Sequence, residues 1–151
     1  MKKFKFSLEK VLQHRRIIED QANAEMLLAK AELNRQIDIL EKHKTERSSA
    51  FQRRYDRQMQ GANSGELSSL DLYIKGQDLR IENQKKVVQA QEKLVEEKME
   101  ILRKAALEVK MIEKLKEKKL TEFREEFLKH EQNEMDENTV LRHRSRDKGA
   151  E

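Results

Sequence analysis

The sequence predicts an all-α fold, a long two-helix antiparallel coiled-coil hairpin that forms a single domain over residues 1–151. Two stripes with helical spacing are separated by a short stretch, 60–65, that holds two of the four glycines, and the chain contains no proline. Gly and Asn tolerate the positive φ that a chain reversal needs, so the helix must break there. We expect helix 1 over about 7–60, a turn over about 61–66, helix 2 over about 67–133 and a frayed, flexible C-terminal tail over about 134–151.

The composition argues against a globular core. Of the 151 residues, 41% are charged and 36% are hydrophobic, and the mean hydropathy is −1.01. Richness in Glu, Lys, Arg, Gln and Leu with a helical repeat is typical of a long helix or a coiled coil rather than of disorder. The formal net charge of +4 is small for so many charged residues.

The first stripe begins after Ser7, which is a candidate N-cap of helix 1. Its members lie three or four residues apart: Leu8, Val11, Arg15, Ile18, Ala22, Met26, Ala29, Leu33, Ile37, Leu40, Lys44, Arg47 and Phe51. The mean spacing lies between the heptad value and that of a free helix, which predicts a nearly straight, weakly supercoiled helix 1.

The second stripe follows Ser64, a candidate cap of helix 2, and contains a heptad seam. The seam has six apolar members: Ile74, Ile81, Val88, Val95, Leu102 and Val109. Polar residues run along the middle of this face at Gln84, Gln91 and Lys98, which weakens the seam and can fix its register. Further apolar residues flank it on one side: Val87, Leu94 and Ile101. Apolar periodicity thins after Phe127, so we expect the tail to fray.

The seven aromatic residues gather at the two ends of the predicted hairpin. Folding the chain about residue 62 or 63 pairs positions whose numbers sum to about 125, so Phe51 and Tyr73 meet near the turn, with Tyr55 one helical turn away. A polar row is expected to continue from Tyr73 on the same face: Gln77, Arg80 and Gln84. The other end holds Phe4, Phe6, Phe123 and Phe127. Aromatic clusters of this kind predict either binding surfaces or staples against fraying.

The residue types that catalysis would need are absent or scattered. There is no cysteine, and the four histidines form no metal-binding pattern. The serines near the turn have no histidine to activate them, and a thin hairpin offers no cavity, so we predict no enzyme, no cofactor and no metal. No apolar run long enough to span a membrane and no secretory signal occurs, which predicts a cytoplasmic protein.

Several blocks resemble the flagellar FliJ family over nearly the whole chain. The most specific block is Phe4-Lys5-Phe6-Ser7-Leu8-Glu9-Lys10-Val11-Leu12, followed by Arg15, Arg16 and Glu19. The small-residue stretch from Ala22 to Ala31 and the segment Leu72-Tyr73-Ile74 with Leu79, Ile81 and Gln84 add to the resemblance.

The resemblance implies a non-enzymatic stalk in the flagellar type III protein export apparatus. Members are cytosolic two-helix coiled coils similar to the central stalk of rotary ATPases. They sit in the hexameric ring of the export ATPase, engage the cytoplasmic domain of the export-gate membrane protein and escort export chaperones. The implied location is cytoplasmic, at the cytoplasmic face of the inner membrane through these partners, and the implied processes are flagellum biogenesis, motility and chemotaxis.

The resemblance also suggests which residues bind. The base residues expected to contact the ATPase ring are Phe4, Phe6, Leu8, Arg15 and Arg16. The tip residues expected to contact the gate are Phe51, Tyr55, Tyr73, Gln77, Arg80 and Gln84. The sequence departs from the family at Lys44 and Arg47, where apolar or aromatic residues are usual, so the extent of the tip patch on helix 1 stays open.

Two other functions are compatible with the sequence. A generic coiled-coil tether or scaffold is predicted by the same periodicity and would self-associate. A nucleic-acid or anionic-membrane binder would use the basic segments 1–16 and 142–148. No aromatic residues interleave with these basic residues for base stacking, so no specific nucleic-acid partner is expected.

Overall fold

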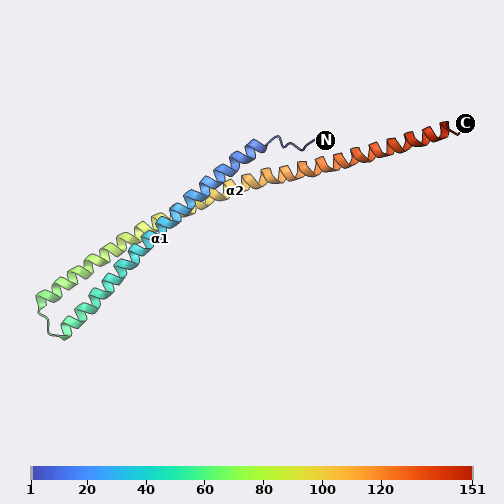
Figure 1. Ribbon diagram of the computed structural model, residues 1–151. Coiled ribbons are helices and arrows are strands. Elements are labelled where there is room, and N and C mark those ends of the chain that lie inside the picture. Colours follow the sequence, from blue (N-terminus) through green and yellow to red (C-terminus); the bar gives the residue numbers. More distant parts are fainter. Residues whose placement is uncertain (1, 151) are drawn as a thin grey trace. The chain divides into compact units, whose positions relative to one another are not determined.

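The computed structural model describes residues 2–150, which form two α-helices and no strand (Figure 1). α1 comprises Glu9–Met59 and α2 comprises Ser64–Lys148. Both helices run through two compact units. The turn unit is Ile18–Ala105, and the terminal unit combines the residues up to Ile17 with those from Ala106 onward. The predicted all-α fold, two helices joined by one turn, is confirmed.

A Schellman motif ends α1. Gly61 has a φ of 84°, and its N–H donates to the carbonyl of Gln58 at 3.2 Å, while the Ala62 N–H donates to the carbonyl of Arg57 at 2.9 Å. These two bonds satisfy carbonyls that the helix end would otherwise leave without a partner. The positive φ expected in this stretch is therefore located at Gly61.

The cap of α2 is Asn63 and not Ser64. The Asn63 Oδ1 accepts the N–H of Glu66 at 2.8 Å, and the Asn63 carbonyl accepts the N–H of Leu67 at 3.2 Å. Asn at the N-cap satisfies one of the first free donors of the helix. Because this cap acts immediately after the Schellman motif, the turn is shorter than the predicted 61–66.

The predicted cap of α1 at Ser7 is also wrong by one position. The carbonyl of Leu8 accepts the first helical bond, from the Leu12 N–H at 2.9 Å, and the helix begins at Glu9. Leu12 is fully buried, whereas Val11, the predicted member of the stripe, is 41% exposed.

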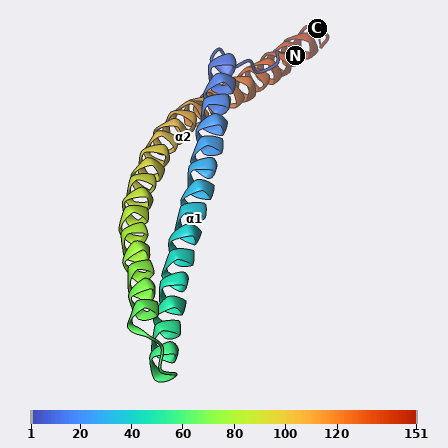
Figure 2. The ribbon, with the colours of Figure 1, turned by 90° about the vertical axis from the view of Figure 1, so that its left-hand side faces the viewer.

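In the turn unit α1 and α2 lie side by side and antiparallel, as both views of the ribbon show (Figures 1 and 2). Ion pairs join the helices at Arg47 with Asp78 and at Arg54 with Asp71. The two residue numbers in each of these pairs add up to 125, as the predicted register requires. The antiparallel hairpin is confirmed.

The seam of α1 follows a stricter heptad than predicted. The residues of the turn unit that face α2 alternate by three and four: Glu19, Ala22, Met26, Ala29, Leu33, Gln36, Leu40, His43, Arg47, Ala50 and Arg54. The predicted seam positions Lys44 and Phe51 are therefore wrong. Ala50 is fully buried and Phe51 is 54% exposed. A strict heptad repeat is the pattern of a left-handed supercoil. The nearly straight, weakly supercoiled form of helix 1 stays a prediction.

The seam of α2 in the turn unit matches the prediction. Ile74, Val88 and Val95 are buried, and between these apolar positions lie Gln77, Gln84, Gln91 and Lys98. Lys98 reaches Glu25 of α1 at 2.9 Å. The centre of the turn unit is therefore polar in every second layer over this stretch.

The terminal unit is closed mainly by apolar and ionic contacts. Leu12 of α1 and Val109 of α2 are buried, and Glu9 pairs with Lys116 at 2.8 Å. The non-helical residues before α1 add an aromatic contact to α2, described below. The first residues of α1 and the facing part of α2 are thus antiparallel in this unit as well.

The predicted end of helix 2 at about 133 is wrong, because α2 continues to Lys148. Residues 128–150 are exposed throughout, so local propensity rather than packing maintains this segment. The sequence offers no proline or glycine until Gly149, whose N–H donates to the carbonyl of Arg146. Basic residues in the last turn, Arg146 and Lys148, favour the helix dipole. That this segment frays stays a prediction.

Candidate binding surfaces

One flank of the hairpin tip carries aromatic rings among guanidinium groups. Phe51 and Tyr55 line a surface recess with Arg47, Ser48, Gln52, Arg54 and Gln58. Each of these two aromatic residues is 54% exposed. The guanidinium carbon of Arg47 lies 5.5 Å from the centroid of the Phe51 ring, in cation–π range. Because the neighbouring Ala50 occupies the seam, Phe51 is turned outward.

Carboxylates of α2 hold these arginines in place. Arg47 pairs with Asp78, and Arg54 pairs with Asp71 through two nitrogens. Both acids are about half exposed. Both arginines are therefore paired without being buried, and they lie beside exposed aromatic rings.

The other flank of the tip carries Tyr73. Its ring, 43% exposed, lines a different recess, with Arg53, Arg57, Glu66, Ser69 and Leu70. Two nitrogens of Arg57 donate to the two carboxylate oxygens of Glu66, at 2.7 and 3.0 Å. These hydrogen bonds lower the pKa of Glu66. The structure thus places Phe51 and Tyr73 in two recesses, and the joint patch expected from the residue-number sum is divided.

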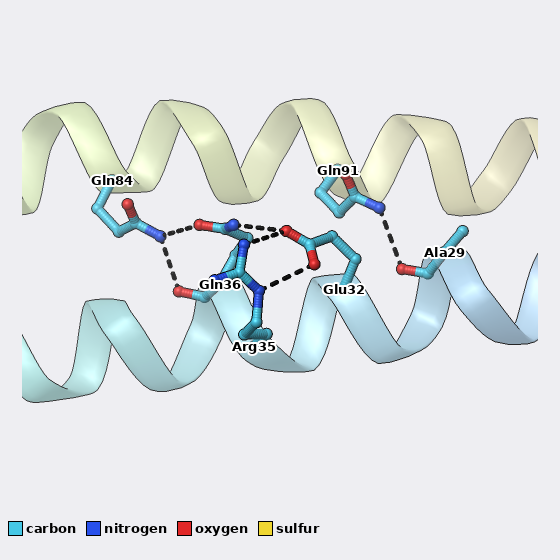
Figure 3. A network of polar contacts seen from close by, with 6 residues as sticks. All are labelled: Ala29, Glu32, Arg35, Gln36, Gln84 and Gln91. Carbon is cyan, nitrogen blue, oxygen red and sulfur yellow. Dashed lines mark hydrogen bonds and ion pairs between the residues drawn. The ribbon is translucent and has the colours of Figure 1, made fainter.

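Gln77 and Gln84 do not continue an outward polar row. Gln77 is 1% exposed, and its Nε2 donates to the Glu46 carboxylate at 3.3 Å while its Oε1 is buried without a partner among the described residues. Gln84 Nε2 donates to the backbone carbonyl and to the side-chain Oε1 of Gln36, at 2.9 and 2.7 Å (Figure 3). Of the predicted row, Arg80 alone is exposed. The seven-residue spacing of Gln77, Gln84 and Gln91 between apolar positions was the signal for the inward orientation.

The seam contacts of Gln84 extend to a charged pair on α1 (Figure 3). Gln36 Nε2 donates to the Glu32 carboxylate at 2.7 Å, and Arg35 donates to both oxygens of Glu32 at 2.7 and 2.9 Å. The hydrogen bonds from Arg35, then from Gln36, lower the pKa of Glu32 to about 2. One heptad further along α2, Gln91 Nε2 donates to the carbonyl of Ala29 at 3.1 Å.

The base carries an aromatic contact between the lead before α1 and the second helix. The rings of Phe4 and Phe123 are tilted, with centroids 5.6 Å apart. Among the residues predicted to contact the ATPase ring, three are half-buried: Phe4, Phe6 and Leu8. Residues 2–7 line a recess together with Lys119, Glu122, Phe123 and Glu126 of α2. The basic lead therefore lies against glutamates of the same unit.

The two arginines predicted at the base already have partners. Arg15 pairs with Glu108 at 2.8 Å, and Arg16 pairs with Glu113 at 3.2 Å. All four side chains are between 40% and 51% exposed. Exposed pairs of this kind contribute little to stability, so a binding partner could exchange with the glutamates at small cost.

Within residues 2–150, no three His, Cys, Asp or Glu side chains are arranged to hold a metal ion. Neither described helix contains the sustained apolar run that crossing a bilayer would require.

Comparisons with known proteins agree with this architecture. The family profile described as flagellar FliJ protein matches residues 4–148. A similar fold occurs in the solved structure of CT670 of Chlamydia trachomatis, which is described as a homologue of YscO. The TM-score is 0.58 and the identity 20%, with 97% of this chain and 99% of that chain covered; at this identity the likeness concerns the fold alone. A search of curated proteins found no significant match.

Proposed function

Because the chain belongs to the flagellar FliJ protein family, we propose that it is a non-enzymatic stalk and coupling component of the flagellar type III protein export apparatus. The observation that carries the proposal is a family match over residues 4–148 of a chain built as one two-helix hairpin. The proposed partners are the hexameric export ATPase, the cytoplasmic domain of the export gate and export chaperones. The proposed location is the cytoplasmic face of the inner membrane, reached through these partners.

The base of the hairpin is the surface that we assign to binding of the ATPase ring. Phe4, Phe6 and Leu8 present half-buried apolar groups within a basic segment, and Arg15 and Arg16 are exposed cations whose glutamate partners are also exposed. A surface that combines aromatic anchors with exchangeable rim charges suits a protein interface, because the anchors slow dissociation while the charges speed association.

The tip of the hairpin is the surface that we assign to binding of the export gate. Phe51, Tyr55, Tyr73 and Arg80 are exposed there, and exposed aromatic rings are the residues that most often carry binding energy. Gln77 and Gln84, which point at α1, are assigned a supporting role: they fix the register that positions the rings.

The first experiment measures binding to both proposed partners. Tagged chain is mixed with purified export ATPase and, separately, with the cytoplasmic domain of the gate, and complex formation and ATP hydrolysis are measured. We expect binding to both and faster hydrolysis by the ATPase. Failure to bind either partner would contradict the proposal.

A variant set tests the base. The double variant Phe4→Ala with Phe6→Ala should weaken stimulation of the ATPase while helicity, measured by circular dichroism, is retained. Phe123→Ala is the matched control, since it removes the partner ring of Phe4 and leaves the lead sequence intact. A smaller loss in Phe123→Ala than in the double variant assigns the contact to the lead. If the folded double variant still stimulated the ATPase fully, the ATPase would contact another part of the chain.

A further inference from the structure

A ridge of apolar side chains on α2 of the turn unit lies outside the seam. Val87, Leu94 and Ile101 are 44%, 38% and 50% exposed. They are seven residues apart, so they form one line along the helix. The neighbouring seam positions Val88 and Val95 already fill the contact with α1. A line of exposed apolar side chains on a polar protein is a candidate interaction site.

The charges beside the ridge are segregated about its midpoint. On the side away from α1, Lys86 and Lys93 precede Leu94, whereas Glu97 and Glu100 follow it. Lys104, one turn beyond Glu100, is the exception. On the same side, Ala90 lies between the levels of Val87 and Leu94 and is small enough to let another helix approach closely.

We propose that this ridge binds the same ridge of a second copy of the chain, with the two α2 helices antiparallel and the two-fold axis beside Leu94. In this arrangement Val87 of each copy faces Ile101 of the other, and the Leu94 side chains face each other. Lys86 comes beside Glu100 of the other copy, and Lys93 comes beside Glu97. In an isologous two-fold contact each pair of different residues occurs twice, and the Leu94 pair at the axis occurs once.

The charge pattern favours a second copy of the chain as the partner and favours an antiparallel orientation of its α2. A parallel copy would bring each lysine against its own equivalent and each glutamate against its own equivalent. In the antiparallel arrangement only Lys93 comes level with its own equivalent, and Glu97 of the other copy lies at the same level. A helix of another protein would not require the ridge and its flanking charges to be self-complementary about one residue. Exposed ion pairs add little energy, so the ridge supplies the affinity and the charges supply the orientation. This dimer does not depend on the proposed role in export.

Disulfide trapping tests the geometry, because the natural chain has no cysteine. Under mild oxidation Leu94→Cys should form a covalent dimer. The matched control is Met99→Cys, which is 48% exposed on the same helix but off the ridge, and it should form far less. Val87→Cys and Ile101→Cys should cross-link when mixed and not separately. Homodimers of each variant alone would contradict the antiparallel arrangement.

Sedimentation and light scattering test the free equilibrium with no cross-link. The wild-type chain should form a dimer whose dissociation constant rises at least tenfold in Leu94→Glu and stays unchanged in Met99→Glu, with equal helicity in all three. Lys86→Glu should weaken the dimer, and adding Glu100→Lys should restore it. A wild-type chain that stays monomeric at every concentration, or Leu94→Cys that cross-links no faster than Met99→Cys, would overturn the proposal.

Discussion

The two units use their aromatic and polar residues in opposite ways. In the terminal unit the ring of Phe4 packs on that of Phe123, and fully buried Leu12 lies in the core. In the turn unit Phe51 and Tyr55 are more than half exposed, whereas Gln77 is buried between the helices. Burial of apolar groups stabilises a fold, and exposure of them leaves that free energy for a partner. Phe4 therefore contributes to the packing of the terminal unit as well as to the proposed contact with the ATPase, whereas Phe51 and Tyr55 contribute little to the fold and are free for a partner.

The largest expected effect concerns the exposed aromatic rings of the tip. The double variant Phe51→Ala with Tyr55→Ala should lower affinity for the cytoplasmic domain of the gate by about 2 kcal/mol, roughly thirtyfold. The free energy of unfolding should change by less than about 0.5 kcal/mol, because both rings lie outside the seam. Calorimetric titration and urea unfolding give the two quantities.

The control for this pair is Leu72→Ala, which removes another exposed apolar side chain of the turn unit. It should leave binding unchanged. Tyr73→Ala shows whether the second recess takes part: a loss of gate affinity as large as that of the double variant would mean that both flanks contact the gate. Normal binding by all these variants would refute the assignment of the tip.

The second effect is a loss of stability at the base, where the aromatic rings pack on each other. Phe123→Ala should lower the free energy of unfolding by about 1.5 kcal/mol, less than for a fully buried ring because Phe123 is half-buried. In a double-mutant cycle with Phe4→Ala the coupling should be about 1 kcal/mol, as for other aromatic pairs. Additive losses would show that the two rings do not stabilise each other, and the contrast with the tip would fail.

Heptad counting predicted the hairpin and its register because both are determined by spacing along the chain. It misplaced the seam of α1 near the tip because hydrophobicity favoured Phe51, whereas the heptad continues through His43 and Ala50. Small and polar seam residues carry no hydrophobic signal. The helix end at about 133 was misplaced for a related reason: apolar periodicity reports packing, and α2 continues to Lys148 without packing.

The candidate site was less predictable than the fold. The sequence predicts that the aromatic residues gather at both ends. Which ring is buried, however, depends on which residues form the seam, and an error of one residue changes the answer. One residue turns a helical side chain by about 100°. The phase error on α1 explains why Phe51 lies in a different recess from Tyr73. For Gln84 the sequence pattern allowed both a seam position and a place in the outward row, and the structure shows the seam position.

The third effect tests the polar seam. Gln77→Leu should raise the free energy of unfolding by about 1 kcal/mol, because a buried amide oxygen without a partner costs free energy that an apolar side chain avoids. Gln84→Leu is the control. It removes an amide that makes two hydrogen bonds, so it should give no gain. Urea unfolding of both variants measures the difference, and equal gains would show that hydrogen bonding in the seam does not decide its stability.

The smallest effect is a dependence on pH at Glu32, which lies beside the same seam. The pKa of Glu32 is lowered from 4.5 to about 2 by its hydrogen bonds from Arg35 and Gln36. A group whose pKa is lower in the folded state contributes stability above its unfolded pKa and loses it as the pH falls through the folded value. The contribution of Glu32 is therefore complete above about 4.5 and disappears towards 2.

Thermal unfolding across this pH range should show a difference between the wild type and Glu32→Gln that shrinks as the pH falls. The carboxyl carbon of Glu32, followed by nuclear magnetic resonance, should titrate at higher pH in Arg35→Met, since that variant removes the principal cause of the shift. Gln36 still donates to Glu32 in that variant, so the pKa should rise only part of the way to its usual value. A titration unchanged by Arg35→Met would mean that the pair does not persist in solution. The lowered pKa of Glu32 would then be attributed to Gln36, whose Nε2 donates to the same carboxylate.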